Sequence, residues 1–198
     1  MHYEIRNYHI TDLSALYKIC LQTANNGSDA SSLLKDSDLA GHLFAAPYAF
    51  FEPELCFILS LDANPYGYIL GAKNSVDFLE KCEKNWFPQL RKRFTLPDEK
   101  DKSLQSNFIR FLHQKQDLTV GLKDYPAHLH IDILPAAQGK GYGRQLIQAF
   151  VDQLKVLNIK GVHLIVSKQN SSAIGFYEHI GFQELKNYGE SLVLVKAL

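Results

Sequence analysis

The chain has 198 residues, 46% of them hydrophobic, and its 21 Lys and Arg residues balance its 21 Asp and Glu residues. This composition is typical of a folded globular protein and argues against extensive disorder. The absence of net charge gives no general attraction for nucleic acid or an anionic membrane. Three widely spaced cysteines without a C-x-x-C pair argue against a disulfide framework or a zinc knuckle.

The length favours one domain over residues 1–198, large enough to bury a core. The first residues lack the basic-then-apolar pattern of a signal peptide, and no apolar run approaches membrane-spanning length. We therefore expect a cytoplasmic protein without nucleic-acid or membrane partners.

The sequence pattern of the first third of the chain predicts alternating strands and helices. Thr11 or Asp12 can cap the first helix, and Asn64 with Pro65 is expected to turn between two strands of a hairpin. The expected elements are a strand at 3–8, a helix continuing to about Thr23, a short helix covering 31–44, and strands at 55–62 and 65–73.

A helical region follows the hairpin. Apolar residues recur at helical spacing over 74–94, with Ser75 as the expected N-cap. Pro88 is expected to bend or divide this helix. A charged loop and another amphipathic helix over 104–112 complete this helical region.

The last third predicts a mixed sheet. Residues 161–166 are almost uniformly apolar, as in a strand covered on both faces. Residues 127–134 alternate, placing Leu129, Ile131 and Ile133 on one face and His128, His130 and Asp132 on the other. The remaining expected elements are a long helix after Tyr142, a short helix from Asn170 to near Gly181, and a final strand at 190–198. This alternation of strands and helices predicts an α/β fold.

A glycine-rich turn joins the strand at 127–134 to the long helix. In Gln138-Gly139-Lys140-Gly141-Tyr142-Gly143, the missing Cβ atoms let the backbone turn tightly and approach a ligand. The helix that follows presents unpaired amides and the positive end of its dipole, which favour an anion, and Lys140 and Arg144 could add charge. The spacing departs from both the Walker A and the dinucleotide-binding fingerprints. A glycine-rich connection without a ligand is the structural alternative.

Two sequence blocks resemble the GNAT N-acetyltransferase superfamily. Gln138, Gly141 and Gly143, after Ile133-Leu134-Pro135, resemble its acyl-CoA signature Gln/Arg-x-x-Gly-x-Gly/Ala. One strand later, its second block is matched by Asn170, Ala173, Tyr177, Gly181 and Phe182. The segments "AHLHIDILPAAQGKGYGRQLI" and "FLEKCEKNWFPQLRKRF" look more closely like bacterial relatives of the acetyltransferase-like domain of eukaryotic O-GlcNAcase, which is generally regarded as a pseudo-acetyltransferase.

The resemblance implies a fold and a cofactor site. The fold would be a mixed, mostly antiparallel sheet flanked by helices, with a V-shaped splay between two central parallel strands. Family members commonly have a short hairpin where this chain has residues 75–123, so this segment would be a helical insertion that could line or cover the acceptor site. Acetyl-CoA would bind in that splay, with its pantetheine arm along Ile133 and Leu134, and no metal is expected. Its pyrophosphate would take amides from Gln138, Gly139, Lys140, Gly141, Tyr142, Gly143 and Arg144, and the second block would add Asn170, Ala173 and Tyr177.

The resemblance also implies direct attack of a primary amine on the thioester in a ternary complex. Tyr177, protonated at neutral pH, is the candidate donor to the departing sulfur, and its alternative role is a core tyrosine. His130 or Asp132 is the candidate proton acceptor. Alternatively, His130 and Asp132 form hydrogen bonds with neighbouring backbone groups, and ordered water takes the place of a side-chain base. Asn170 could also cap its helix, a role compatible with contact to the arm or the substrate. Alternation on one strand gives a metal cluster of His128, His130 and Asp132 only weak support.

The leading function hypothesis is therefore an acetyl-CoA-dependent N-acetyltransferase acting on a small-molecule or peptide amine. A catalytically inactive acetyl-CoA-binding module is the first alternative, and an O-acyltransferase is the second. Homodimers are common in such families, and no residue pattern here specifies an interface.

Overall fold

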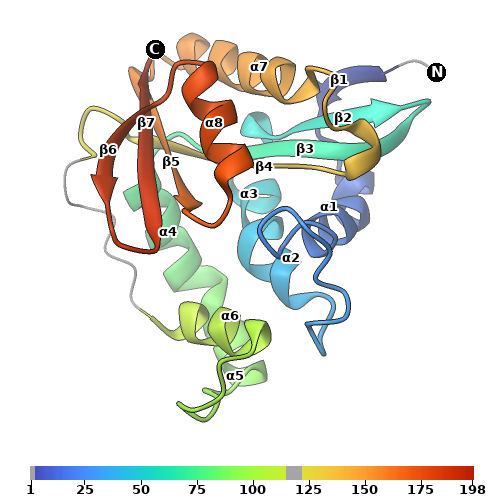
Figure 1. Ribbon diagram of the computed structural model, residues 1–198, viewed down its shortest axis with the longest axis vertical. Coiled ribbons are helices and arrows are strands. Elements are labelled where there is room, and N and C mark those ends of the chain that lie inside the picture. The colour runs from blue at the N-terminus through green and yellow to red at the C-terminus, as the bar shows by residue number, and fades with distance from the viewer. Residues whose placement is uncertain (1–2, 115–121) are drawn as a thin grey trace.

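A single sheet occupies the centre of the protein, whose computed structural model describes residues 3–114 and 122–198 (Figure 1). Within these residues the strand order is β1-β2-β3-β4-β5-β7-β6, with β4 and β5 parallel and the other neighbours antiparallel. The strands are β1 (Tyr3–Asn7), β2 (Phe57–Leu61), β3 (Asn64–Ala72), β4 (Ala127–Ile133), β5 (Gly161–Ser167), β6 (Gln183–Asn187) and β7 (Ser191–Ala197). The predicted α/β class, mostly antiparallel sheet and β2–β3 hairpin are confirmed. The hairpin turn lies at Asp62 and Ala63, both with positive φ, and not at Asn64 and Pro65 as predicted.

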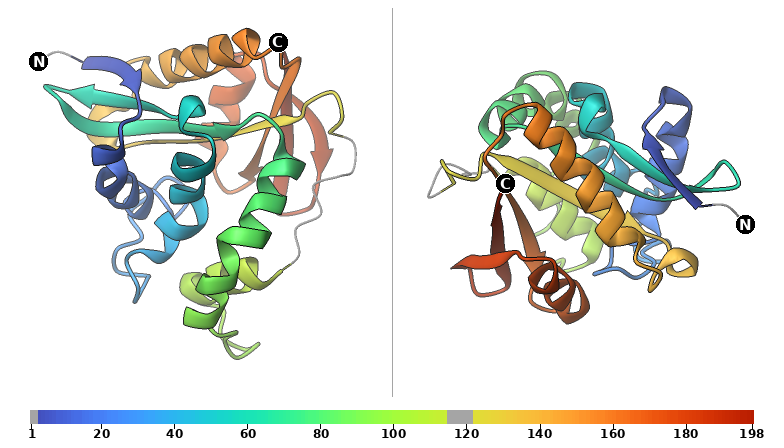
Figure 2. Two further views of the ribbon diagram at one scale, coloured as in Figure 1. Left: turned by 180° about the vertical axis from the view of Figure 1, so that it is seen from behind. Right: turned by 90° about the horizontal axis from the view of Figure 1, so that it is seen from above.

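Helices cover both faces of the sheet. They are α1 (Leu13–Leu21), α2 (Leu39–Phe44), α3 (Ala46–Phe51), α4 (Ser75–Asn85), α5 (Phe87–Arg93), α6 (Leu104–His113), α7 (Tyr142–Val156) and α8 (Ser171–His179). Helix α7 lies along one face, α1–α3 cover the other, and α4–α6 extend away from the sheet (Figures 1 and 2). None of the described helices is long and apolar enough to cross a membrane.

Strand alternation builds a core on each face of the sheet. Leu129 of β4 packs into the core that contains Phe150 of α7, whereas Tyr68 of β3 packs with Leu16 of α1 on the opposite face. Gly71 has no space for a side chain, because an added Cβ would collide with the Phe150 ring. The predicted alternation along β4 therefore separates an apolar face toward α7 from a polar face toward α1.

The two parallel strands separate soon after they meet. Strands β4 and β5 pair at Ala127 with Val162 and at His128 with His163, and the described pairing goes no further. Strand β4 continues to Ile133, while β5 turns to pair with β7 along its whole length. The predicted V-shaped splay is confirmed.

Pro88 divides the long helical region as predicted. Helix α4 ends at Asn85 and α5 begins at Phe87, with proline in its first turn, where the missing N–H costs no helical bond. The predicted N-cap was wrong by one residue, since Oδ1 of Asn74 accepts the N–H groups of Val76 and Asp77 at 2.9 and 3.3 Å. The part of the predicted insertion at 115–121 lies outside the described residues.

Three other expectations differ from the structure. The carboxylate of Asp12 does not cap α1, because it forms an ion pair with Arg6 at 2.7 Å and accepts the His9 N–H. The short helix expected within 31–44 begins only at Leu39. Strand β6 was not predicted, because its segment is mostly polar and exposed at the edge of the sheet, where no buried face imposes an apolar pattern.

Candidate active site

The glycine turn before α7 depends on left-handed backbone geometry. Gly139 has a φ of 72° and Gly141, the N-cap of α7, a φ of 80°. A Cβ added at either position would meet no atom within 4 Å. Glycine is therefore needed here for its backbone conformation, and the space around it stays open to a ligand.

This turn presents a row of available amides. Across the described residues, no hydrogen-bond partner is found for the backbone N–H groups of 139–144. The Gln138 N–H is already used, because it donates to the Pro135 carbonyl at 3.2 Å. Arg144 is exposed beside these amides, and the Lys140 ammonium donates to the Ala136 carbonyl at 2.9 Å. Six amides, those of 139–144, are therefore available to an anion, whereas the sequence predicted seven, those of 138–144.

The edge of β4 that faces the splay is closed by a side chain. The Leu134 N–H donates to the Tyr66 carbonyl of β3 at 2.8 Å, so this amide is committed to the sheet. Antiparallel alternation then directs the main-chain groups of Ile133 toward the splay. The Ile133 carbonyl accepts the side-chain amide of Gln138 at 2.7 Å. A ligand pairing with β4 would replace this contact.

Helix α8 lines the opposite side of the splay. Asn170 caps it by accepting the Ala173 N–H at 3.1 Å, which confirms the predicted capping role. Tyr177 is 8% exposed, with its ring near Phe176 and Phe182. Burial, with a contribution from the Asp132 charge, raises the pKa of Tyr177. Its hydroxyl is therefore protonated at neutral pH.

His130 and Asp132 form an ion pair on the polar face of β4. Nε2 of His130 lies 3.0 Å from Oδ2 of Asp132, and Tyr68 donates to the same oxygen at 2.5 Å. Burial disfavours the imidazolium, but the neighbouring Asp132 carboxylate outweighs it and raises the pKa of His130 to about 10. Burial also opposes charge on Asp132, yet the His130 charge and the Tyr68 hydroxyl lower its pKa. At neutral pH the pair is therefore an imidazolium beside a carboxylate.

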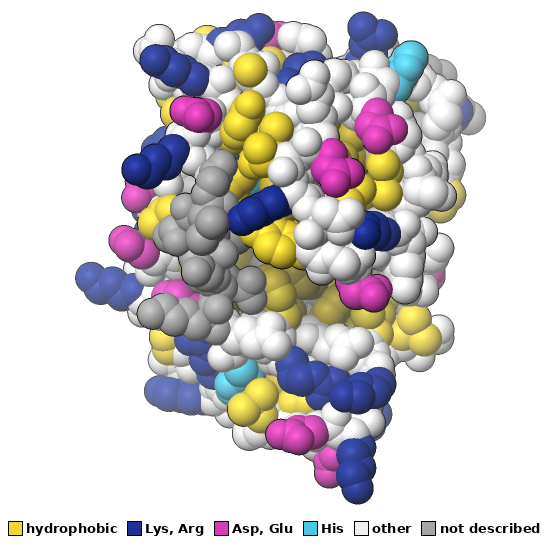
Figure 3. Space-filling view, turned by 60° about the vertical axis from the view of Figure 1, so that its left-hand side comes forward, with side chains coloured by type: hydrophobic (Ala, Val, Ile, Leu, Met, Phe, Trp, Pro, Cys, Tyr) yellow, Lys and Arg dark blue, Asp and Glu magenta, His cyan; other side chains and the backbone are white. Residues whose placement is uncertain are grey.

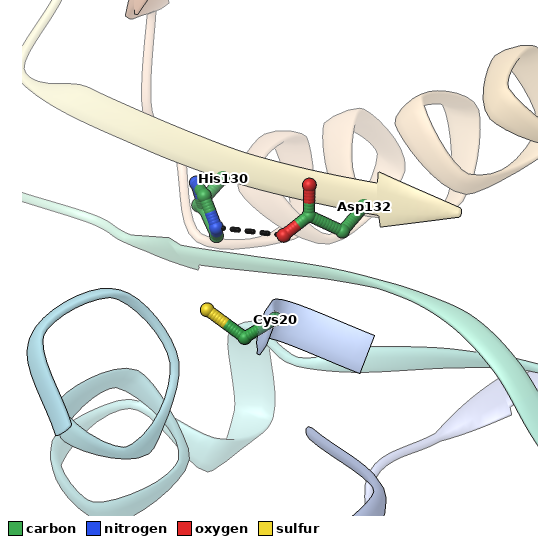
Figure 4. Close-up of side chains that lie close together, drawn as sticks. All are labelled: Cys20, His130 and Asp132. Atoms are coloured by element: carbon green, nitrogen blue, oxygen red, sulfur yellow. Dashed lines mark ion pairs between the residues drawn. The ribbon is translucent and has the colours of Figure 1, made fainter. Parts of the chain in front are cut away.

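Cys20 approaches this pair from the end of α1 (Figure 4). The potential ligand atoms of Cys20, His130 and Asp132 lie within 4.8 Å of one another, and such a set suits Zn²⁺. Nε2 of His130 makes no hydrogen bond of acceptable geometry with any described residue, so its contact with Asp132 is ionic. Burial raises the pKa of the Cys20 thiol. A metal would have to displace protons from both Cys20 and His130.

His128 has a structural environment. Its Nε2 lies 2.9 Å from the Tyr48 hydroxyl, and its Nδ1 lies 2.6 Å from the Ser75 hydroxyl. Burial, with the nearby His163 and His130, lowers the pKa of His128 to about 3. His128 is therefore neutral, and both of its ring nitrogens have hydrogen-bond partners. It is separate from the His130–Asp132 ion pair on the same face of β4.

A cavity of about 1000 Å³ joins these features. It extends from the glycine turn, through the splay, to the helices beyond the His130–Asp132 pair. Sequence patterns did not identify Cys20 and Phe44 in its lining or Tyr68 beside it, because each reaches the site from a distant part of the chain. The predicted cofactor and catalytic residues that line the cavity are Ile133, Gln138, Gly139, Gly141, Tyr142, Gly143, Arg144, Asn170, Ala173, Tyr177, His130 and Asp132.

Fold and site together define a class of protein with a glycine turn and unpartnered amides beside two parallel strands that separate. Residues 106–184 match the family described as acetyltransferase (GNAT) domain. The protein in the crystal structure of SsHAT is 34% identical, with a TM-score of 0.93, and the match covers 100% of this chain and 98% of that one. The chain belongs to the GNAT acetyltransferase family.

More distant relatives agree with this placement. Protein O-GlcNAcase of Rattus norvegicus is 23% identical over 186 residues, which is 92% of this chain but 20% of that protein. The chain thus spans about a fifth of the length of this curated relative. The PaiA N-acetyltransferase of Thermoplasma acidophilum, solved with coenzyme A, is 15% identical with a TM-score of 0.63 over 100% of both chains, and shares the fold. Both predicted resemblances are confirmed.

Proposed function

We propose that this chain is a single-domain, cytoplasmic, acetyl-CoA-dependent N-acetyltransferase that acts on a primary amine by direct attack in a ternary complex. One observation carries the proposal: the amides of 139–144, Tyr177 and the His130–Asp132 pair border one continuous cavity. The amides suit a diphosphate, and the other three side chains are the titratable groups that thioester aminolysis needs.

The cavity suits acetyl-CoA in both shape and chemistry. Acetyl-CoA supplies an activated thioester at the end of a long arm that carries a diphosphate. The unpartnered amides of 139–144 would bind the diphosphate at the mouth of the splay. The edge of β4 at Ile133 would pair with the arm once the Gln138 side chain moves aside. Asn170 and Ala173, at the start of α8, line the cavity and would border the arm on its other side.

The protein's own residues would then move two protons. As the amine nitrogen bonds to the acetyl carbon and the carbon–sulfur bond breaks, the nitrogen loses a proton and the sulfur gains one. Asp132 is ionised and takes the first proton, directly or through water, while His130 keeps the carboxylate charged. Tyr177 donates the second from its neutral hydroxyl. Water in the cavity restores both groups.

Binding and turnover test the proposal separately. Titration calorimetry with acetyl-CoA should show saturable binding, and NMR should show perturbed amides in 139–144. Thiol release across a panel of primary amines should then show turnover, with an amide identified by product mass. Saturable binding without turnover of any amine would contradict the enzyme and favour the binding module. An ester product would indicate an O-acyltransferase, and amides unperturbed by saturating coenzyme A would overturn the proposed site.

A further inference from the structure

The cavity does not end at the proposed catalytic residues. Past His130 it continues between the sheet and the inner sides of α2, α4, α5 and α6. The face of the molecule shown in Figure 3 has a hollow across its middle, and the floor of this hollow is largely hydrophobic. The side chains that line this end include Phe44, Phe78, Leu79, Phe87, Phe108 and Phe111. We call this end the aromatic chamber.

Aromatic rings connect the chamber to the proposed reaction centre. The centroid of the Phe44 ring lies 5.1 Å from that of the Phe108 ring, in an edge-to-face arrangement, and 6.2 Å from that of the His130 ring. All four rings line the cavity, and Phe44 and Phe108 are half-buried whereas Phe78 and Phe87 are buried. A molecule with its amine beside Asp132 would therefore place its remaining atoms against aromatic faces.

The chamber offers little to a polar or multiply charged molecule. Among the described residues that line the cavity, Asp132 is the one carboxylate, and it already faces His130. The Tyr48 hydroxyl is engaged with His128, and the Thr23 hydroxyl donates to the Ile19 carbonyl at 2.8 Å. A second ammonium group or a set of sugar hydroxyls would lose its hydration without finding partners here.

We propose that the acceptor is an arylalkylamine: a primary amine on a short chain that carries one apolar aromatic ring system and no second charge. This inference rests on the proposed function, because it names the acceptor of the same transfer. Burial of the ring against Phe44 and Phe108 would supply affinity through apolar area and ring contacts. Polyamines, amino sugars and lysine side chains of charged peptides would be poor acceptors.

An amine panel with an independent binding measurement tests this assignment. Phenethylamine and tryptamine should show a kcat/KM at least about tenfold above that of spermidine or glucosamine, a difference of about 1.4 kcal/mol. Titration calorimetry of phenethylamine and spermidine, each into protein saturated with coenzyme A, measures acceptor binding without chemistry. Phenethylamine should bind detectably more tightly.

Variants locate the binding. Phe44→Ala and the milder Phe108→Leu should raise the KM for phenethylamine several-fold and leave acetyl-CoA affinity unchanged. Phe50→Ala removes a ring that is 67% exposed and does not line the cavity, so its kinetics should match those of the wild type. A KM that is unchanged in both folded chamber variants would overturn the assignment.

The outcomes separate this inference from the proposed function. Preferred acetylation of spermidine or glucosamine would overturn the arylalkylamine assignment and leave the transferase intact. Binding of phenethylamine that is weakened by Phe108→Leu, without turnover of any amine, would overturn the proposed function and support the chamber. Failure of phenethylamine to bind the protein saturated with coenzyme A would overturn the assignment.

Discussion

Nε2 of His130 lies 3.0 Å from Oδ2 of Asp132, two residues further along the same strand. This pair lies where the polar face of β4 meets the cavity, and the Tyr68 hydroxyl of the neighbouring strand supports its carboxylate at 2.5 Å. In a low-dielectric environment each charge depends strongly on the other. The pair therefore links the stability of the sheet to the proposed chemistry.

The ion pair predicts a loss of stability in alkali. The pKa of His130 is about 10 in the folded protein, against 6.5 for an ordinary histidine, so its charged form favours folding. This contribution is complete below about pH 6.5 and is lost as the pH rises through about 10. We expect the wild-type Tm to fall more steeply between pH 7 and 10 than that of His130→Gln.

The matched control is His179→Gln, which removes an exposed imidazole at the end of α8. Its pH profile of Tm should follow the wild type. Parallel profiles for His130→Gln and the wild type would contradict the assignment of a charged His130.

Tyr177→Phe should lower kcat by about 100-fold, a typical effect of losing a general acid. Acetyl-CoA affinity should change little, because the ring is retained and the substitution removes only the hydroxyl. Steady-state kinetics and calorimetry measure the two effects. Tyr188→Phe removes a hydroxyl from a tyrosine that is 57% exposed and should leave both unchanged. A normal kcat in Tyr177→Phe would exclude its role as the acid.

Gly141→Val should weaken binding of coenzyme A by about tenfold or more. The reason is the backbone, since a φ of 80° costs a branched residue about 1–2 kcal/mol and the row of amides would shift to relieve it. Gly175→Ala is the control, because its φ is not in the left-handed region and an added Cβ meets no atom within 4 Å. Calorimetry should show normal binding in that variant. Equal affinity in Gly141→Val would argue that the turn does not hold the diphosphate.

Chelation should leave activity unchanged. The His130–Asp132 pair is already compensated by charge, and a metal would have to displace protons from His130 and Cys20. Turnover before and after dialysis against a chelator is the measurement. The contrary result would be activity that is lost on dialysis and restored by Zn²⁺. If Cys20→Ser also lowered activity and Cys56→Ser did not, this cluster would be a metal site.

Local signals predicted much of the structure around the proposed cofactor site. The glycine turn, the start of α7 and the Asn170 cap each depend on residues within a few positions, so their chemistry is legible in the chain itself. The same holds for Pro88, whose missing N–H divides α4 from α5. Strand β6 escaped prediction because an exposed edge strand has no apolar face to mark it.

The acceptor side depended on contacts between distant segments. Alternation along β4 placed His130 and Asp132 on one face, but their charge states follow from burial and from Tyr68 on a neighbouring strand. Residues 75–123 were predicted as a helical insertion, and folding leaves Phe108 of that insertion half-buried at the cavity wall beside Phe44. The amino-acid sequence thus determined the left-handed glycine turn, the Asn170 cap and the family, because backbone conformation and capping are local. The tertiary structure alone decided which side chains meet and how they ionise, because dielectric environment and proximity depend on the packing of the whole chain.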